Sequence, residues 1–163
     1  GGKSGRGSEN KVPFIAAVQT GPDGRPLYAC FAKQPFTSEA VAIWAAKSLA
    51  TSAQVISDGL WCFRGVRIIG AEHEATVTGG GKASTRLSQF KAVNTLLGNL
   101  KTALSGTYHA FDFAKYAHRY LAEVQYRFNR RFNLASILPR LLHAAALTPP
   151  RPAPIIRLAE VCR

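Results

Sequence analysis

The first part of the chain alternates short apolar segments with strong turn signals. An apolar, β-compatible segment at Val12–Thr20 is closed by Gly21-Pro22-Asp23-Gly24, and a second apolar segment follows at Pro26–Lys33. Two such segments on either side of a turn rich in glycine and proline predict a β-hairpin over residues 12–33.

An alanine-rich segment and another short apolar segment come next. Thr37 offers a helix N-cap that is soon followed by an acid, so a helix is predicted at Ala40–Ala50. Gln54–Ser57 predicts a short buried strand that leads directly into Asp58-Gly59. Asp58 is therefore expected at the C-terminal end of a strand, where α/β folds position their chemistry.

After Asp58 the pattern is less regular. It predicts a short helix at Leu60–Gly65, a strand at Val66–Ile69 and an aperiodic basic loop at Ala71–Phe90.

The second half of the chain is predicted to be helical. A helix starts near Ala92 and breaks at Ser105-Gly106-Thr107, and Asp112 is a suitable N-cap for a long helix that reaches about Arg131. A third helix is predicted at Leu134–Leu147, and the proline run after it predicts a stiff extended tail. This order of strands and helices indicates an α/β fold with a helical C-terminal part.

Composition limits the classes of protein and partner. The 163 residues are 47% hydrophobic, which suits one globular domain, and 21 Lys and Arg against 9 Asp and Glu give a formal net charge of +12. Such an excess favours a polyanionic partner, with nucleic acid as the first candidate. The 3 cysteines are an odd number and predict reduced, cytosolic thiols. No apolar run approaches the roughly 18 residues of a membrane span, and no signal segment opens the sequence.

Several short strings, taken together, carry a family resemblance. They are Gly5-Arg6-Gly7-Ser8-Glu9-Asn10-Lys11-Val12-Pro13, Ser57-Asp58-Gly59, Val93-Asn94-Thr95-Leu96-Leu97-Gly98-Asn99-Leu100-Lys101, Gly106-Thr107-Tyr108-His109, Tyr120-Leu121-Ala122-Glu123 and Tyr126-Arg127-Phe128-Asn129-Arg130-Arg131. On these strings the chain resembles bacterial insertion-sequence transposases with an ISXO2-like transposase domain, over nearly its whole length. The resemblance implies an RNase H-like mixed sheet flanked by helices, which carries out DNA transposition by metal-dependent phosphodiester cleavage and strand transfer.

The resemblance also implies a metal site. Asp58 matches the second aspartate of the family, and Asn94 matches the third ligand position, which relatives fill with glutamate or asparagine. Both residues would hold Mg²⁺ or Mn²⁺ through oxygen atoms. Lys101 follows Asn94 by two helical turns and is expected to assist at the same phosphate. Taken without the resemblance, Asp58 suits a turn, Asn94 suits a helix N-cap and Lys101 suits a solvated surface position.

The first aspartate of the family is expected on a strand before the Gly-rich opening, but this chain has no aspartate before Val12 and no methionine at all. We therefore expect a trimmed or fragmentary transposase that lacks its first, central strand and is catalytically incomplete as given. Loss of that strand would leave its two neighbours without a pairing partner. The expected division is a catalytic domain at residues 1–132 and a C-terminal helix with a proline-rich tail at residues 133–163.

Basic residues after Asn94 are candidates for contacts with DNA phosphates, which give salt-sensitive binding that does not depend on sequence. They are Lys101, Lys115, Arg119, Arg127, Arg130 and Arg131, each of which also suits a solvated position. His109 is a further candidate for DNA contact, after a first expected role in packing or fixing its loop.

Two other patterns are expected to be structural. Tyr116, Tyr120, Val124 and Phe128 recur every four residues and predict a core-facing stripe rather than a platform for stacking bases. His73 lies between two glutamates, but three adjacent residues of one regular element cannot converge on a metal ion.

Two functions of different classes remain open from the sequence. The first is a transposase that acts on insertion-sequence ends and target DNA, in the bacterial cytoplasm at the nucleoid, as a homo-oligomer on paired ends. The alternative is a non-enzymatic basic nucleic-acid-binding protein, for which the charge and the arginine-rich helix suffice and Asp58 is only a turn residue. Binding of Mg²⁺ or Mn²⁺ that depends on Asp58 distinguishes the two.

Overall fold

The computed structural model describes residues 11–77, 79, 87–109 and 112–157. Most of the Gly-rich opening and the centre of the loop predicted at Ala71–Phe90 lie outside the described residues. The chain divides into two compact units, one of residues 13–102 and one that contains residues 103–163 together with Val12 and the residues before it. Within the described residues, none of the helices combines the length and the apolar character that a membrane span needs.

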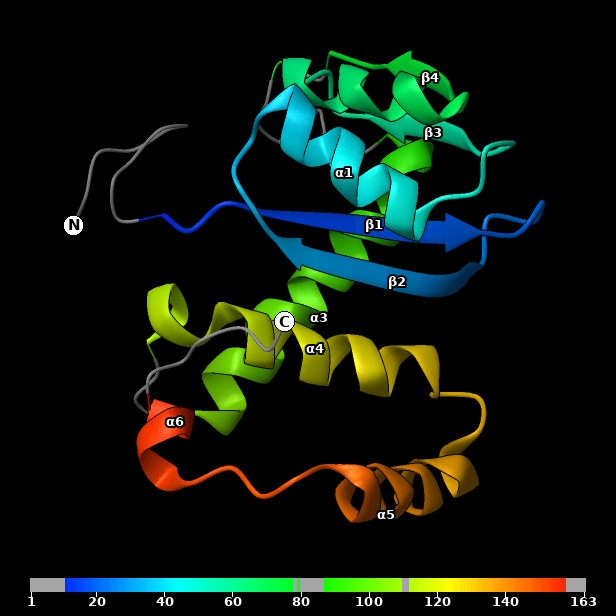
Figure 1. The fold of residues 1–163 in the computed structure, drawn as a ribbon. Coiled ribbons are helices and arrows are strands. Elements are labelled where there is room, and N and C mark those ends of the chain that lie inside the picture. Colours follow the sequence, from blue (N-terminus) through cyan, green and yellow to red (C-terminus); the bar gives the residue numbers. More distant parts are fainter. Residues whose placement is uncertain (1–10, 78, 80–86, 110–111, 158–163) are drawn as a thin grey trace. The chain divides into compact units, whose positions relative to one another are not determined.

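The hairpin predicted at residues 12–33 is confirmed. Strands β1 (Phe14–Thr20) and β2 (Pro26–Lys33) pair antiparallel and open the first unit (Figure 1). In the turn that joins them, the Gly21 N–H donates to the Arg25 carbonyl at 2.9 Å, and Gly24 adopts a φ of 74°. A φ of this sign favours glycine, so the turn signal in the sequence had a physical basis.

Helix α1 (Ser38–Ser48) has the predicted N-cap but begins two residues before the predicted Ala40. Thr37 is its N-cap, since the Thr37 hydroxyl oxygen accepts from the Ala40 N–H at 3.2 Å. The helix ends two residues earlier than the predicted Ala50. Its apolar face joins β1 and a 3₁₀ helix, η1 (Trp61–Ile69), in the main core cluster. The buried members of that cluster are Ile15, Val41, Trp44, Ala45, Cys62 and Val66.

The segment after Asp58 differs from the prediction. Helix η1 continues through Ile69, so the predicted strand at Val66–Ile69 is wrong. The β-branched residues of this segment favoured a strand, but its buried positions follow helical spacing. Cys62, Gly65 and Val66 are buried, whereas Ile68 is 76% exposed.

A strand lies inside the predicted loop instead. Strand β3 (Gln54–Ser57), which the sequence predicted, pairs in parallel with β4 (Glu72–Ala75). β4 has one ladder partner among the described strands, and its glutamates are exposed. Its polar sequence therefore gave no strand signal.

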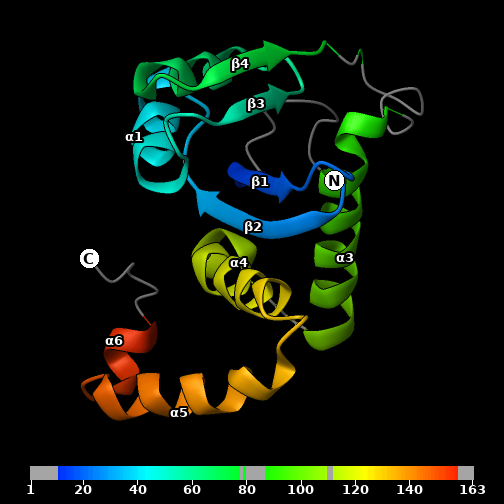
Figure 2. The same ribbon diagram turned by 90° about the vertical axis from the view of Figure 1, so that its right-hand side faces the viewer.

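The described strands form two separate two-stranded sheets, β1 with β2 and β3 with β4. In both views they follow one another in the order β2, β1, β3, β4, with α1 on one face (Figures 1 and 2). Helix α3 (Lys91–Thr107) covers the opposite face, and η2 (Ser88–Phe90) leads into it. This unit is a mixed α/β arrangement with helices on both sides of its strands.

Helix α3 is longer than the sequence predicted. The break expected at Ser105-Gly106-Thr107 is wrong, because these residues form the last turn of α3. The chain leaves the helix after Tyr108, whose N–H still donates to the Leu104 carbonyl at 3.2 Å. Outside its own helix, no atom of the described residues lies within 4 Å of the position that a Cβ on Gly106 would take, so the helix tolerates this glycine.

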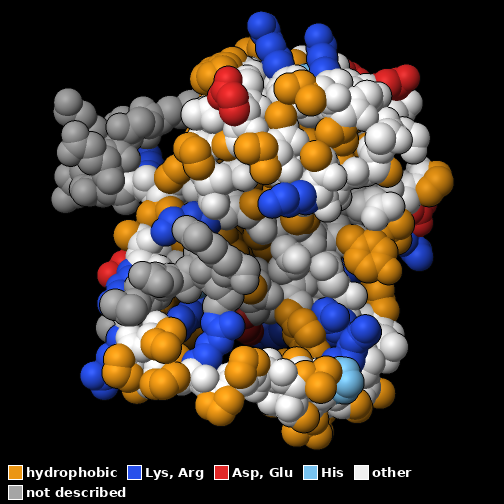
Figure 3. Space-filling view, in the orientation of Figure 1, with side chains coloured by type: hydrophobic (Ala, Val, Ile, Leu, Met, Phe, Trp, Pro, Cys, Tyr) orange, Lys and Arg blue, Asp and Glu red, His pale blue; other side chains and the backbone are white. Residues whose placement is uncertain are grey.

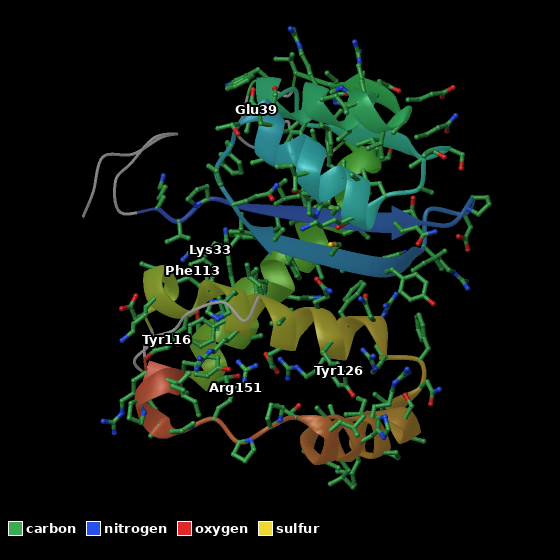
Figure 4. All side chains as sticks on the ribbon, viewed as in Figure 1. Lys33, Glu39, Phe113, Tyr116, Tyr126 and Arg151 are labelled. Atoms are coloured by element: carbon green, nitrogen blue, oxygen red, sulfur yellow. The ribbon has the colours of Figure 1, made fainter. Side chains whose placement is uncertain are left out.

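The second unit is helical. Helix α4 (Phe113–Asn129) starts at its predicted N-cap, because the Asp112 carboxylate accepts from the Lys115 N–H at 2.9 Å. A 3₁₀ turn, η3 (Leu134–Ser136), leads into α5 (Ile137–Leu147), which confirms the third predicted helix. The Tyr126 hydroxyl donates to the Ile137 carbonyl at 3.0 Å and so joins α4 to the start of α5 (Figure 4).

The tail that follows α5 is only partly extended. Residues Ala153–Arg157 form a short helix, α6, so the prediction of a uniformly extended tail is wrong. The Arg119 guanidinium of α4 donates to the Ile156 carbonyl at 3.0 Å and thereby ties α6 to α4. Helix α5 buries no residue, and its apolar side chains lie on the surface (Figure 3). The exposed ones include Leu138, Leu141, Leu142 and Leu147.

Candidate metal and nucleic-acid site

Asp58 lies at the C-terminal end of β3, as the sequence predicted, within a tight turn. The Leu60 N–H donates to Asp58 Oδ1 at 3.2 Å, and the intervening Gly59 has a φ of 81°. A Cβ on Gly59 would meet the Cα of Val77 at 3.2 Å, so both the backbone angle and the space require glycine. The half-buried carboxylate is thus held at the end of a strand by its own turn.

The charge of Asp58 affects the pKa of Cys62 in η1. Burial raises the pKa of the Cys62 thiol, and the Asp58 carboxylate adds to that rise. Cys62 is fully buried in the core cluster, so it is held as a neutral thiol rather than as a reactive thiolate.

Ser57 connects the Asp58 turn to β4. The Ser57 hydroxyl lies 2.9 Å from His73 Nε2 and accepts from the Gly59 N–H at 3.4 Å. The Ser57 carbonyl accepts from the Thr76 N–H at 2.9 Å. Sequence reasoning missed this pair of side chains because the parallel register of β3 and β4, which brings them together, was not predicted.

A further contact connects the residue that follows β4 to the segment that leads into the helix of Asn94. The Gln89 side-chain amide in η2 donates to the Thr76 hydroxyl at 2.8 Å, and α3 begins two residues later at Lys91. In both ribbon views the first turns of α3 lie beside the β3–β4 sheet (Figures 1 and 2). The strand end with Asp58 and the helix with Asn94 are therefore neighbouring parts of one compact unit.

Asn94 lies inside α3, three residues after its first residue. The alternative role of Asn94 as a helix N-cap is therefore wrong. Asn94 is half-buried, and Lys101 is exposed two turns further along the same helix. Within the described residues, no group of three or more His, Cys, Asp and Glu side chains is placed to hold a metal ion. Asp58 and Asn94, the two predicted ligands, thus lie in the same unit but outside any such group.

The glutamates beside His73 do not converge with it. Glu72 and Glu74 are exposed on one face of β4, where the Gln54 amide donates to Glu72 Oε2 at 3.1 Å, and His73 lies on the other face beside Ser57. The strand thus separates the three side chains, as the sequence argument required.

The candidate DNA-binding arginines of the second unit are engaged with other groups of that unit. The Arg127 guanidinium forms an ion pair with Glu123 at 2.6 Å, and Arg119 donates to the Ile156 carbonyl. The guanidinium carbon of Arg130 lies 3.8 Å from the centre of the Tyr126 ring. That of Arg131 lies 3.9 Å from the centre of the Phe128 ring, so these two cations are stacked on aromatic rings rather than extended into solvent.

The ammonium of Lys115 lies 5.2 Å from the centre of the Tyr116 ring, near the start of α4. Tyr116 and Phe113 lie at this end of α4 (Figure 4). His109 is exposed in the segment between α3 and α4. These positions keep both Lys115 and His109 on the surface of the second unit.

The tyrosine stripe on α4 is displaced from the centre of the buried face. The buried residues of α4 are Ala117, Leu121 and Val124, so the stripe predicted from Tyr116 to Phe128 flanks that face, with Val124 its buried member. Tyr120 packs against three other aromatic rings, with ring centres 4.8 Å from Tyr108, 6.3 Å from Phe113 and 6.4 Å from Tyr116. The tyrosines are engaged with one another, which favours packing over base stacking.

Comparison with known proteins adds one finding to this geometry. The family model of the ISXO2-like transposase domain matches residues 1–129, which include the Asp58 turn, α3 and α4. No curated protein and no solved structure matches the chain.

Proposed function

Because the chain belongs to the ISXO2-like transposase domain family, we propose that it serves DNA transposition through a divalent-metal site in which Asp58 and Asn94 are ligands. The family has a transposition-related function, and transposases of this class generally use divalent metal ions. The observation that carries the proposal is the Asp58 turn, which fixes a carboxylate at the end of β3 in the same unit as Asn94.

The arrangement of strands supports an RNase H-like fold with one central strand between β1 and β3. Each described sheet has two strands, so β1 and β3 each have one ladder partner among the described strands. A strand between the two sheets would pair with the backbone of β1 and of β3 and would unite the four strands.

The donor atoms of the two residues fit a hard divalent cation. Asp58 supplies a charged carboxylate oxygen and Asn94 a neutral carbonyl oxygen, both of which suit Mg²⁺ or Mn²⁺. The Leu60 N–H occupies one acceptor position of Asp58 Oδ1, and a carboxylate has acceptor capacity beyond one hydrogen bond. When bound, a pair of such ions activates the attacking hydroxyl and stabilises the leaving oxygen of a phosphodiester.

Two ligands are fewer than the family mechanism uses. The remaining ligand is the first aspartate of the family, and residues 1–12 of this chain contain no aspartate. We therefore propose that residues 1–163 alone bind metal weakly and do not cleave DNA. Metal-dependent nicking by the purified 163-residue chain would contradict this part of the proposal.

Metal binding tests the two ligands directly. In a titration with Mn²⁺, Asp58→Ala should abolish site binding, whereas Asn94→Asp should raise the affinity by about tenfold or more, since an added ligand charge contributes at least about 1.4 kcal/mol. Asn99→Asp is the matched control, because Asn99 is an exposed asparagine on the same helix. An equal gain from Asn99→Asp would mean that charge in general, and not ligation by Asn94, raises the affinity.

Activity provides the second test of Asp58. In a transposase that carries this chain together with the first aspartate, Asp58→Ala should remove Mg²⁺-dependent strand transfer. Undiminished transfer would refute the assignment, and DNA binding without metal binding would favour the non-enzymatic alternative.

We propose that DNA is contacted by Lys101 in the first unit and by basic residues of the second, which are His109, Lys115, Arg119, Arg127, Arg130 and Arg131. A net charge of +12 supports a polyanionic partner. Log affinity falls linearly as log salt rises, and removing one phosphate contact makes this slope less steep by about one. Lys115→Ala should show this change, whereas Arg127→Ala should change the slope less, because Glu123 already neutralises Arg127.

A further inference from the structure

His73 is a core-facing side chain on an otherwise polar strand. Its Cα pairs with that of Val55 in the parallel ladder, so its ring lies on the same face of the sheet as Val55 and Ser57. Val55 packs against the core cluster, and Ser57 is only 6% exposed. The imidazole is therefore directed toward the interior beside the residue that precedes Asp58.

Among the residues that the structure describes, one nitrogen of the His73 ring has a hydrogen-bond partner and the other has none. Nε2 lies 2.9 Å from the Ser57 hydroxyl, whereas Nδ1 is buried without a hydrogen-bond partner. Burial, reinforced by the charges of Arg67 and Arg64, lowers the pKa of His73, so the ring is held neutral. Among the groups packed against it, Arg67 also donates to the His73 carbonyl at 3.4 Å.

An apolar side chain would fill this position at a lower cost. Burying a polar nitrogen without a partner opposes folding, and a leucine would avoid that cost. The contribution of the imidazole therefore lies in its bond to Ser57. The same Ser57 hydroxyl also accepts from the Gly59 N–H. Gly59 belongs to the turn in which the Leu60 N–H donates to the Asp58 carboxylate.

We propose that His73 is a positioning residue that acts through Ser57 to fix the turn of Asp58, Gly59 and Leu60, and so to aim the Asp58 carboxylate. This inference rests on the proposed role of Asp58 as a metal ligand. Ser57 connects His73 to the turn and is held at two atoms. Its hydroxyl is bonded to His73 of β4, and its carbonyl accepts from the N–H of Thr76, the residue after β4.

Three substitutions of His73 separate its hydrogen bond from its volume. His73→Gln carries a donor near the position of Nε2, His73→Asn carries one near the position of Nδ1, and His73→Leu carries none. We expect the amides of Gly59 and Leu60 to exchange hydrogen roughly fivefold faster in His73→Leu and His73→Asn, the loss of about one hydrogen bond. His73→Gln should keep the wild-type exchange rates.

Ser57→Ala provides the second arm. If His73 acts through Ser57, Ser57→Ala should accelerate exchange at Gly59 and Leu60 as His73→Leu does, and the double variant should add nothing further. The Mn²⁺ affinity should fall in the same variants and recover in His73→Gln. Unchanged exchange in His73→Leu, or equal exchange in His73→Asn and His73→Gln, would overturn the inference. Exchange rates are measured without metal. If the wild-type chain fails to bind Mn²⁺, that result would count against Asp58 as a ligand, whereas the exchange rates would still test the role of His73.

Discussion

Gly65 is the point at which η1 approaches α1 most closely, and its replacement by alanine tests the packing behind the Asp58 turn. A Cβ at position 65 would lie far inside contact distance of the Ser38 carbonyl oxygen and 3.1 Å from the Ala42 nitrogen. Both are backbone atoms of α1, so no rotation of a side chain can relieve the contact. Either α1 or η1 must move, and Val41, Ala45, Cys62 and Val66 are fully buried between them.

The cost follows from the size of this displacement. Overpacking of a core by one methyl group costs about 1–3 kcal/mol, and a contact with rigid backbone places Gly65→Ala near 3 kcal/mol. For a unit of this size, about 1 kcal/mol lowers the melting temperature by roughly 4–8 °C. We therefore expect a loss of more than about 10 °C.

Urea unfolding followed by circular dichroism measures the effect, with Gly98→Ala as the matched control. Gly98 lies in α3 with no atom near the position of an added Cβ, so alanine there should stabilise by about 0.5–1 kcal/mol. The two glycine-to-alanine changes should thus act in opposite directions. A Gly65→Ala protein as stable as the wild type would refute the close packing of η1 on α1.

Two further predictions concern a titrating group and a helix cap. Because the pKa of His73 is lowered from its ordinary value of 6.5, the unfolded chain takes up the proton first as the pH falls. The free energy of unfolding should therefore be unaffected by His73 well above pH 6.5 and should decline below it, and in urea titrations His73→Gln should remove that part of the decline. Asp112→Ala should destabilise α4 by about 1 kcal/mol, seen as a loss of helical circular dichroism on mild heating, because the Lys115 N–H loses its acceptor.

The sequence predicted the elements whose signals are local. The hairpin, the N-caps Thr37 and Asp112, and the strand that ends at Asp58 depend on turn residues, capping side chains and short apolar runs that act within a few residues. Strand β4 could not be predicted in this way. Its sequence, Glu72-His73-Glu74-Ala75, becomes a strand only through pairing with β3, which is a contact between distant residues.

One error was avoidable from the sequence. Cys62, Gly65, Val66 and Ile69 follow the spacing of a helix face, and the structure buries or partly buries all four. The β-branched residues of this segment outweighed that spacing in the prediction. The helix continues because Gly65 and Val66 pack on α1, and this tertiary contact overrides the local preference for a strand.

The candidate site was predicted unevenly for the same reason. Asp58 and Asn94 are identified by short strings, and the structure places both in one unit. Ser57 and His73 belong to no such string. They meet only because β3 and β4 run in parallel with Val55 opposite His73, so their hydrogen bond becomes visible only with the register.

Arg130 and Arg131, two of the proposed phosphate contacts, follow the end of α4 and are ordered in a way that the sequence did not indicate. Taken from the sequence, Arg130 and Arg131 are long, flexible cations whose ordering by DNA would cost side-chain entropy. In the structure their guanidinium groups lie 3.8 Å and 3.9 Å from the centres of aromatic rings, and each also donates to a carbonyl of α4. A stacked guanidinium keeps its full charge and has other N–H groups that can donate to a phosphate. Much of the ordering cost is therefore met on folding, and a phosphate would meet a cation whose position is already set.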